Sequence, residues 1–337
     1  ERNAHDVPVH AGELYLELHR GTLTNRHEIK RNNRKGEVAL HDLEGLTVLD
    51  AIERDVPADD TAVRPLMETL LKNQFHDILP GSSISRVHEE SIAEMHRMIA
   101  EAKQQQNAVM NAAGEGVTVY NPLGFARNDT IYLPFAAPVW GQTFENVFGQ
   151  TVTAIEGVRL APMETRTLQD GDLHPATDPV FTVTDDGLET PFYRVTWDEN
   201  GGFASLFDKR VCREVRSGLP LGTFVLAEDV PANWDNWDVD ADTVEDRFQP
   251  TAKLLSRTCV SVGSSQERFR CTYQLTARST LTQDVVFFAN RPEIVFETRM
   301  DWNDKHRFLK VAFDTDIHSR FASHEIQFGH IERPTTR

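Results

Sequence analysis

Residues 73–84 read NQFHDILPGSSI, and this stretch interrupts a region that is otherwise rich in helix-forming residues. Pro80 and Gly81 are typical of a tight turn, and Ser82 and Ser83 are residue types that cap the start of a helix. The stretch therefore predicts one helix that ends before the turn and another that begins after it.

A turn between two helices needs only the proline, the glycine and a serine, so His76 and Asp77 require a separate explanation. One explanation is structural, because the helix dipole favours a histidine at the C-terminal end of a helix. The other is functional, because neutral imidazole is a good zinc ligand and an adjacent carboxylate can orient a substrate hydroxyl or a second ligand. Spacing alone favours the structural explanation and leaves both open.

Three amphipathic segments surround this turn. The first runs from about residue 25 to 52, the second from about residue 61 to 75, and the third from the serines to Gly114. Their apolar residues recur at spacings of mostly three and four, which is the period of a helix with one buried face. We therefore predict a three-helix bundle over residues 25–114. The stripe of the third helix consists of Ile84, Val87, Ser91, Met95, Met98, Ile99 and Ala102.

The sequence after residue 115 consists of short runs rich in Val, Thr, Phe and Tyr, which are typical of strands. The stretch 192–207 predicts a β-hairpin, because strand-like residues flank Asn200-Gly201-Gly202. Residues 170–179 (DGDLHPATDP) show neither the apolar period of a helix nor that of a strand, so they predict a domain boundary. We expect a small β-domain over residues 115–172 and a large antiparallel β-sandwich over residues 173–337.

The composition excludes several classes of partner. The chain has 337 residues, of which 39% are hydrophobic, and a formal net charge of -17. A negative field of this size repels phosphate backbones and anionic lipids, so neither nucleic acid nor a membrane surface is expected as a partner. No apolar run approaches the roughly 18 residues that a membrane span requires.

The cysteines are odd in number and show no CxxC spacing. They are Cys212, Cys259 and Cys271, a pattern that argues against a disulfide scaffold and against a cysteine-ligated zinc. We expect each of them to be a small buried residue, and we expect a reducing compartment such as the cytoplasm.

The other histidines of the helical region do not suggest a closed metal site. His88 and His96 are eight residues apart, near two helical turns, but Glu89, Glu90 and Arg97 surround them. This charged neighbourhood predicts a solvated helix face rather than a pair of metal ligands.

The densest group of aromatic and acidic residues is WDNWDVDADTVED, residues 234–246. An indole ring can stack on the C–H groups of a sugar while carboxylates accept its hydroxyls, so Trp234 and Trp237 are candidates for substrate binding. The alternative is a long loop whose tryptophans close one end of a sandwich. Both interpretations stay open, since one loop can do both.

Several stretches, in order along the chain, resemble the family-38 glycoside hydrolases, which are retaining α-mannosidases, and in particular their bacterial branch. The helix-turn sequence QFHDILPGSS (residues 74–83) resembles the signature of that family. The resemblance implies an α+β multidomain fold in which a helix bundle precedes a galactose-mutarotase-like supersandwich. The other matching stretches are residues 12–37, 192–210, 228–240, 296–313 and 324–335.

The resemblance also implies functions for individual residues. It makes His76 a ligand of a catalytic zinc, Asp77 a contact to sugar hydroxyls, and His19 a residue that lines the mannose site. In that family the remaining zinc ligands, the nucleophile and the acid/base lie in a preceding α/β domain, of which residues 1–24 resemble only the end. We therefore expect no catalytic residue in this chain, an incomplete zinc site, a missing N-terminal domain as partner, and a sandwich that is cut short.

The sequence thus predicts part of a zinc-dependent retaining α-mannosidase that acts on mannose-containing oligosaccharides and is inactive as an isolated chain. Retaining hydrolysis needs two carboxyl groups roughly 5 Å apart, and the matched motifs provide neither. The alternative function is a non-catalytic carbohydrate-binding β-sandwich module with Trp234 and Trp237 as its stacking platform. A third possibility is that these domains only support a catalytic one.

Overall fold

A computed structural model of the protein describes residues 19–111, 116–169, 180–235, 237–240, 247–261, 263–326 and 329–335. The described residues form two compact units. The first, called the helical unit below, comprises the described parts of residues 1–124, 163–167 and 229–246. The second, called the β unit, comprises the described parts of residues 125–162, 168–228 and 247–337.

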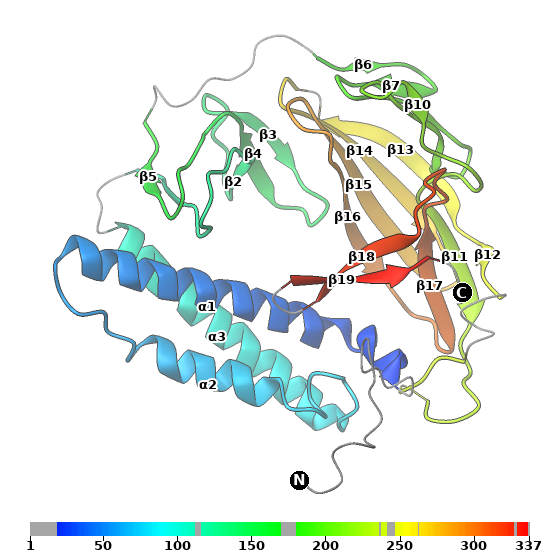
Figure 1. The fold of residues 1–337 in the computed structure, drawn as a ribbon. Helices are drawn as coiled ribbons and strands as arrows, with labels where there is room; N and C mark the ends of the chain where they lie inside the picture. Colours follow the sequence, from blue (N-terminus) through cyan, green and yellow to red (C-terminus); the bar gives the residue numbers. More distant parts are fainter. Residues whose placement is uncertain are drawn as a thin grey trace, which may run out of the picture. The chain divides into compact units, whose positions relative to one another are not determined.

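Three helices make up most of the helical unit, as predicted. They are α1 (His27–Glu53), α2 (Val63–Asn73) and α3 (Ser85–Asn111), and each packs against the other two (Figure 1). Pro65 lies in the first turn of α2, where its missing N–H breaks no intrahelical hydrogen bond. The hydrophobic core of the unit is formed by Ala39, Leu40, Leu43, Val63, Leu66, Leu70, Met95, Met98, Ile99 and Ala102.

The helical unit also contains shorter elements. A 3₁₀ turn, η3 (Gly21–Leu23), precedes α1, and the strands β1 (Thr118–Tyr120) and β5 (Thr165–Thr167) pair antiparallel. Residues 229–240 belong to this unit too, although they lie far along the chain between strands of the β unit.

The β unit contains five antiparallel sheets among its described residues. The three-stranded sheet near its start has the order β2-β4-β3, and the next has five strands in the order β10-β9-β8-β7-β6. Their bounds are β2 (Ile131–Leu133), β3 (Gln142–Glu145), β4 (Thr151–Ile155), β6 (Thr182–Val183), β7 (Gly187–Glu189), β8 (Tyr193–Trp197), β9 (Phe203–Asp208) and β10 (Arg213–Glu214).

The remaining sheets of the β unit have the orders β12-β11-β17, β13-β14-β15-β16 and β18-β19. The predicted hairpin is confirmed, because β8 and β9 pair across a turn in which Gly201 has φ +85°. The bounds of the remaining strands are β11 (Thr223–Glu228), β12 (Gln249–Pro250), β13 (Lys253–Ser261), β14 (Gln266–Gln274), β15 (Thr280–Phe288), β16 (Ile294–Asp301), β17 (Arg307–Ala312), β18 (Phe321–Ile326) and β19 (Gly329–Pro334).

The five-stranded and four-stranded sheets share one core, which is the arrangement of a sandwich. Buried side chains from β7, β8 and β9 pack in one cluster with side chains from β14 and β15. The cluster consists of Leu188, Val195, Phe203, Leu206, Leu221, Phe269, Val285 and Phe287. The predicted fold class, helices followed by antiparallel β-domains, is confirmed.

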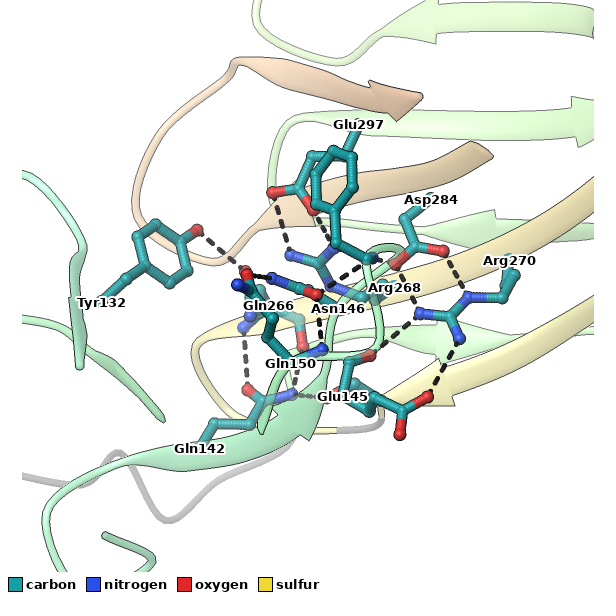
Figure 2. A network of polar contacts seen from close by, with 12 residues as sticks. Tyr132, Gln142, Glu145, Asn146, Gln150, Gln266, Arg268, Arg270, Asp284 and Glu297 are labelled. Carbon is teal, nitrogen blue, oxygen red and sulfur yellow. Dashed lines mark hydrogen bonds and ion pairs between the residues drawn. The ribbon is translucent and has the colours of Figure 1, made fainter. Parts of the chain in front are cut away.

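A buried charge cluster links neighbouring strands of the four-stranded sheet (Figure 2). The Arg268 guanidinium is fully buried and lies 3.1 Å from Asp284 Oδ2 and 2.6 Å from Glu297 Oε2, both from Nη1. Arg270 Nε lies 2.7 Å from Asp284 Oδ1, and its Nη2 donates to the Glu145 carbonyl at 2.9 Å. Since Glu145 belongs to β3, the cluster joins the three-stranded sheet to the four-stranded one.

The cysteine prediction holds for one residue of three. Cys271 is buried on β14, whereas Cys212 and Cys259 are exposed, and all three are free thiols. Cys212 lies in a turn and Cys259 near the end of an outer strand, β13, and neither location supplies a core to fill.

Two neighbouring leucines on α2 test the helical core. Leu70 is 4% exposed and Leu71 is 59% exposed. We expect Leu70→Ala to lower the free energy of unfolding by roughly 2–5 kcal/mol, because it removes packed methyl groups and leaves a cavity, and Leu71→Ala by less than about 0.5 kcal/mol. Urea titrations followed by circular dichroism at the helical band measure both, and equal effects would contradict the described packing.

The charge cluster of the β unit gives a second prediction. Asp284→Asn removes the carboxylate shared by Arg268 and Arg270, so the two buried or half-buried guanidinium groups lose their common partner and, among the described carboxylates, Arg268 keeps only Glu297. We expect a loss of roughly 3–5 kcal/mol in the free energy of unfolding, against less than about 0.5 kcal/mol for Asp185→Asn at an exposed position of the same unit. Chemical denaturation followed by tryptophan fluorescence measures both, and an unchanged stability in Asp284→Asn would refute this account.

Candidate functional site

Residues 74–83 form a series of turns after α2. Ile78 N–H donates to the Phe75 carbonyl at 2.9 Å, and Gly81 N–H donates to the Ile78 carbonyl at 2.9 Å. His76 therefore lies beyond Asn73, where α2 ends, and not within the last helical turn. The predicted serine cap also differs, because the Ser83 hydroxyl donates to the Asp77 carbonyl at 2.5 Å and α3 begins at Ser85.

His76 and Asp77 point into solvent side by side. Their side chains are 76% and 48% exposed, and His76 Nε2 lies 3.5 Å from Asp77 Oδ2. The imidazole also contacts the ring of Phe75, with 4.2 Å between ring centroids. Both polar groups are therefore accessible to a ligand.

The beginning of the turn is fixed to α1 by a side-chain amide. Gln74 Nε2 donates to Asn33 Oδ1 at 3.0 Å and to Glu37 Oε1 at 3.1 Å. Asn33 Nδ2 in turn donates to Glu37 Oε1 at 2.9 Å, so the acceptors are themselves held in place. This anchor lies two residues before His76.

The end of the turn packs tightly against the segment that precedes α1. Gly81 has φ +79°, a conformation that favours glycine, and it is buried. A Cβ atom at this position would lie 2.7 Å from Asn25 Oδ1 and 2.9 Å from Arg26 Cβ, so no larger side chain fits there. The Lys30 ammonium donates to the carbonyl of Pro80, at 2.9 Å.

The second group of predicted site residues is brought together by residues 19–23. The rings of His19 and Trp237 meet edge to face with 5.0 Å between centroids, and Gly21 N–H donates to the Trp237 carbonyl at 2.9 Å. Trp237 N–H donates to the Trp234 carbonyl at 2.8 Å. Trp234 has φ +59° and is 67% exposed, so its indole face is open to solvent.

Both groups thus contact one short segment of the helical unit. Residues 19–21 contact the tryptophan loop, and residues 25–30 contact the turn that carries His76 and Asp77. The segment between them contains η3, which leads directly into α1. The structure therefore places all five predicted site residues in the helical unit and none in the sandwich.

The described residues do not form a closed metal site. Nowhere in the described ranges do three His, Cys, Asp or Glu side chains come close enough together to hold a metal ion. A structural zinc site has four ligands and a catalytic one has three protein ligands. His76 with Asp77 can therefore supply at most part of such a site.

One histidine predicted to lie on a solvated face is buried. His88 is 4% exposed, and neither of its ring nitrogens has a hydrogen-bond partner among the described residues. The prediction of a solvated face is wrong here, because His88 lies three residues before Ser91 and seven before Met95 on the buried stripe of α3. The predicted exposure of His96 is confirmed, since that side chain is 53% exposed.

Two stretches of the chain match models of known families. Residues 17–112 match the family model of the alpha mannosidase middle domain, and residues 188–337 match that of the glycosyl hydrolases family 38 C-terminal domain. Alpha-mannosidase 2C1 of Mus musculus is 33% identical over 99% of this chain, and an alpha-mannosidase of Saccharomyces cerevisiae is 25% identical over 98% of it. These alignments cover 32% and 29% of the two relatives.

The fold agrees with these matches. The crystal structure of an alpha-mannosidase from Enterococcus faecalis V583 superimposes with a TM-score of 0.69 at 14% identity, covering 93% of this chain and 45% of that one. The chain spans about a third of the length of the curated relatives that it matches. It belongs to glycosyl hydrolase family 38, with residues 17–112 matching the middle domain and residues 188–337 the C-terminal domain of that family.

Proposed function

We propose that this chain is part of a zinc-dependent retaining α-mannosidase that hydrolyses α-mannosides in mannose-containing oligosaccharides. The support comes from relatives named alpha-mannosidases, which align with nearly the whole chain at up to 33% identity. The middle-domain match includes the turn with His76 and Asp77, so the proposal places the contribution of this chain at that turn.

The observation that carries the proposal is an exposed imidazole and carboxylate on a backbone that is held at both ends. Gln74 fixes one end of the turn and Lys30 the other, while His76 and Asp77 remain open to solvent. A neutral imidazole nitrogen can bind zinc, and a carboxylate can accept hydrogen bonds from sugar hydroxyls. When bound, zinc would supply a positive charge that attracts sugar hydroxyl oxygens.

The described residues supply one zinc ligand in this proposal, not a complete site. The other ligands and both catalytic carboxyl groups would come from residues outside the described ranges. We assign no catalytic residue to this chain, and its own side chains act only by binding and orienting.

The tryptophan loop and His19 complete the proposed sugar contacts. The exposed face of Trp234 suits stacking on the C–H groups of a sugar, and the ring of His19 against Trp237 holds the loop in place. Because this loop belongs to the helical unit, a sandwich module that binds carbohydrate by itself has less support than a site built around the bundle.

No helix within the described ranges is both long enough and apolar enough to cross a bilayer. The three free thiols support the proposal of a reducing compartment, the cytoplasm.

The metal content of the purified 337-residue chain tests the incomplete site. After dialysis against buffer without metal, we expect much less than one zinc per chain and no cleavage of a nitrophenyl α-mannoside, because one imidazole and one carboxylate bind zinc weakly. Elemental analysis measures the metal, with a dialysed sample of a known zinc enzyme as control. A content of about one zinc per chain would contradict the proposal.

Two substitutions distinguish the enzyme from the binding module. In the complete protein, His76→Ala should lower zinc occupancy and turnover together, by roughly tenfold or more, because one ligand is lost. Trp237→Ala should mainly weaken substrate binding, while His41→Ala, at an exposed position on α1, should change nothing. If Trp237→Ala abolished mannoside binding while His76→Ala left zinc content and turnover unchanged, the module function would be favoured instead.

A further inference from the structure

The ammonium of Lys30 contacts uncharged oxygen atoms. It donates to Asn25 Oδ1 at 2.7 Å and to the Pro80 carbonyl at 2.9 Å. Both acceptors are neutral, and no ion pair within the described ranges includes Lys30. Lys72 and Lys209, by contrast, each pair with a glutamate.

This arrangement is costly for a charged side chain. Burial lowers the pKa of Lys30 to about 8, because the half-buried ammonium loses part of its hydration without gaining a carboxylate. A group in such an environment is a candidate for a functional site when it lies beside one. Lys30 lies beside the candidate site, since it donates a hydrogen bond to the turn that carries His76 and Asp77.

On the turn, Lys30 donates to the carbonyl oxygen of a proline. Proline has no N–H, so Pro80 can be fixed through its backbone only by its carbonyl oxygen. The residue that follows, Gly81, is already wedged against Asn25 and Arg26 at φ +79°. The hydrogen bond from Lys30 therefore fixes the peptide group between Pro80 and Gly81, which connects the tightly packed glycine to the preceding turns.

The surroundings of Lys30 are compatible with a positive charge. His88 on α3 is buried, and its pKa is lowered by burial first and then by the charges of Arg26 and Lys30. A histidine with a lowered pKa stays neutral at neutral pH, so it adds no third positive charge next to the other two.

We propose that Lys30 is a positioning residue for His76 and Asp77, because it fixes the Pro80 end of their turn while Gln74 fixes the other end. The two anchors lie on one helix, α1, within two turns of each other, at Lys30 and at Asn33 and Glu37. The turn is thereby attached to a rigid element on both sides of the two residues. The effect of Lys30 on zinc occupancy and turnover rests on the function proposed for His76. Its effect on the order of the turn does not.

Hydrogen exchange of the turn measures the structural consequence directly. In Lys30→Met the amides of Ile78, Leu79 and Gly81 should exchange about tenfold faster, because a hydrogen bond to a charged donor is lost. Lys30→Arg should restore most of the protection, since it keeps a charge and donors. Lys35→Met, an exposed lysine of the same helix, is the control and should match the wild type.

The catalytic consequence is measured separately, as turnover and zinc occupancy of the complete protein with the same variants. We expect Lys30→Met to lower both, with partial rescue by Lys30→Arg. Unchanged exchange in Lys30→Met overturns the proposal whatever happens to turnover. Faster exchange with unchanged turnover and zinc supports the anchor but overturns its positioning effect on His76 and Asp77, whereas failure of the function proposed for His76 itself shows in His76→Ala.

Folding of each variant is checked by circular dichroism before exchange is measured. If Lys30→Met does not fold, Lys30→Gln replaces it, because glutamine keeps a neutral donor but is too short to reach both acceptors. Faster exchange of the turn amides in Lys30→Gln then supports the proposal, and unchanged exchange overturns it.

Discussion

A fully buried guanidinium is tolerated only where carboxylates surround it, and this requirement organises the β unit. The Arg268 guanidinium, on β14, is buried, and its charge is neutralised by Asp284 of β15 and Glu297 of β16. Arg270 shares Asp284 and also reaches the Glu145 carbonyl, so the same cluster ties a separate sheet to the sandwich. Buried ion pairs seldom add stability beyond that of apolar side chains of the same volume. The main effect of the cluster is therefore on register, since the two arginines meet their carboxylates in only one pairing of the strands.

In the helical unit the polar contacts have a different effect. Gln74 and Lys30 hold a surface turn in place, whereas the charges of the β unit lie in its interior. The amide of Gln74 and the ammonium of Lys30 bond to backbone or side-chain oxygens across the contact between α1 and the turn. Both contacts leave the polar groups of His76 and Asp77 exposed beside each other, while the His76 ring lies against Phe75. An apolar contact would fix the position of the turn less well, because hydrophobic packing is not directional and hydrogen bonds are.

Local patterns predicted the elements of this fold well, and contacts between distant segments poorly. The period of the apolar residues located three helices, and Asn200-Gly201-Gly202 located a hairpin, because both signals lie within one segment. The burial of His88 was also encoded locally, in its spacing from Ser91 and Met95, but its charged neighbours obscured it. The contact of Lys30 with the turn and that of His19 with the tryptophan loop join residues far apart in sequence, and no period in a single sequence specifies them. The proposal that His76 binds zinc rests on resemblance to a family, since spacing alone favoured a helix-end histidine.

A site whose ligands come from separate parts of a protein binds more tightly when each part is already ordered at the moment the parts meet. Ordering a loop at that moment costs roughly 1–2 kcal/mol per residue in backbone entropy, which would be subtracted from the affinity for metal and sugar. In this chain the backbone around His76 is already fixed by turn hydrogen bonds and by two anchors to α1. What remains to be ordered is the side-chain torsions of His76 and Asp77, a cost of about 1 kcal/mol or less for each. For the zinc site proposed above, a preorganised His76–Asp77 pair is thus a more favourable contribution than a flexible loop carrying the same two residues.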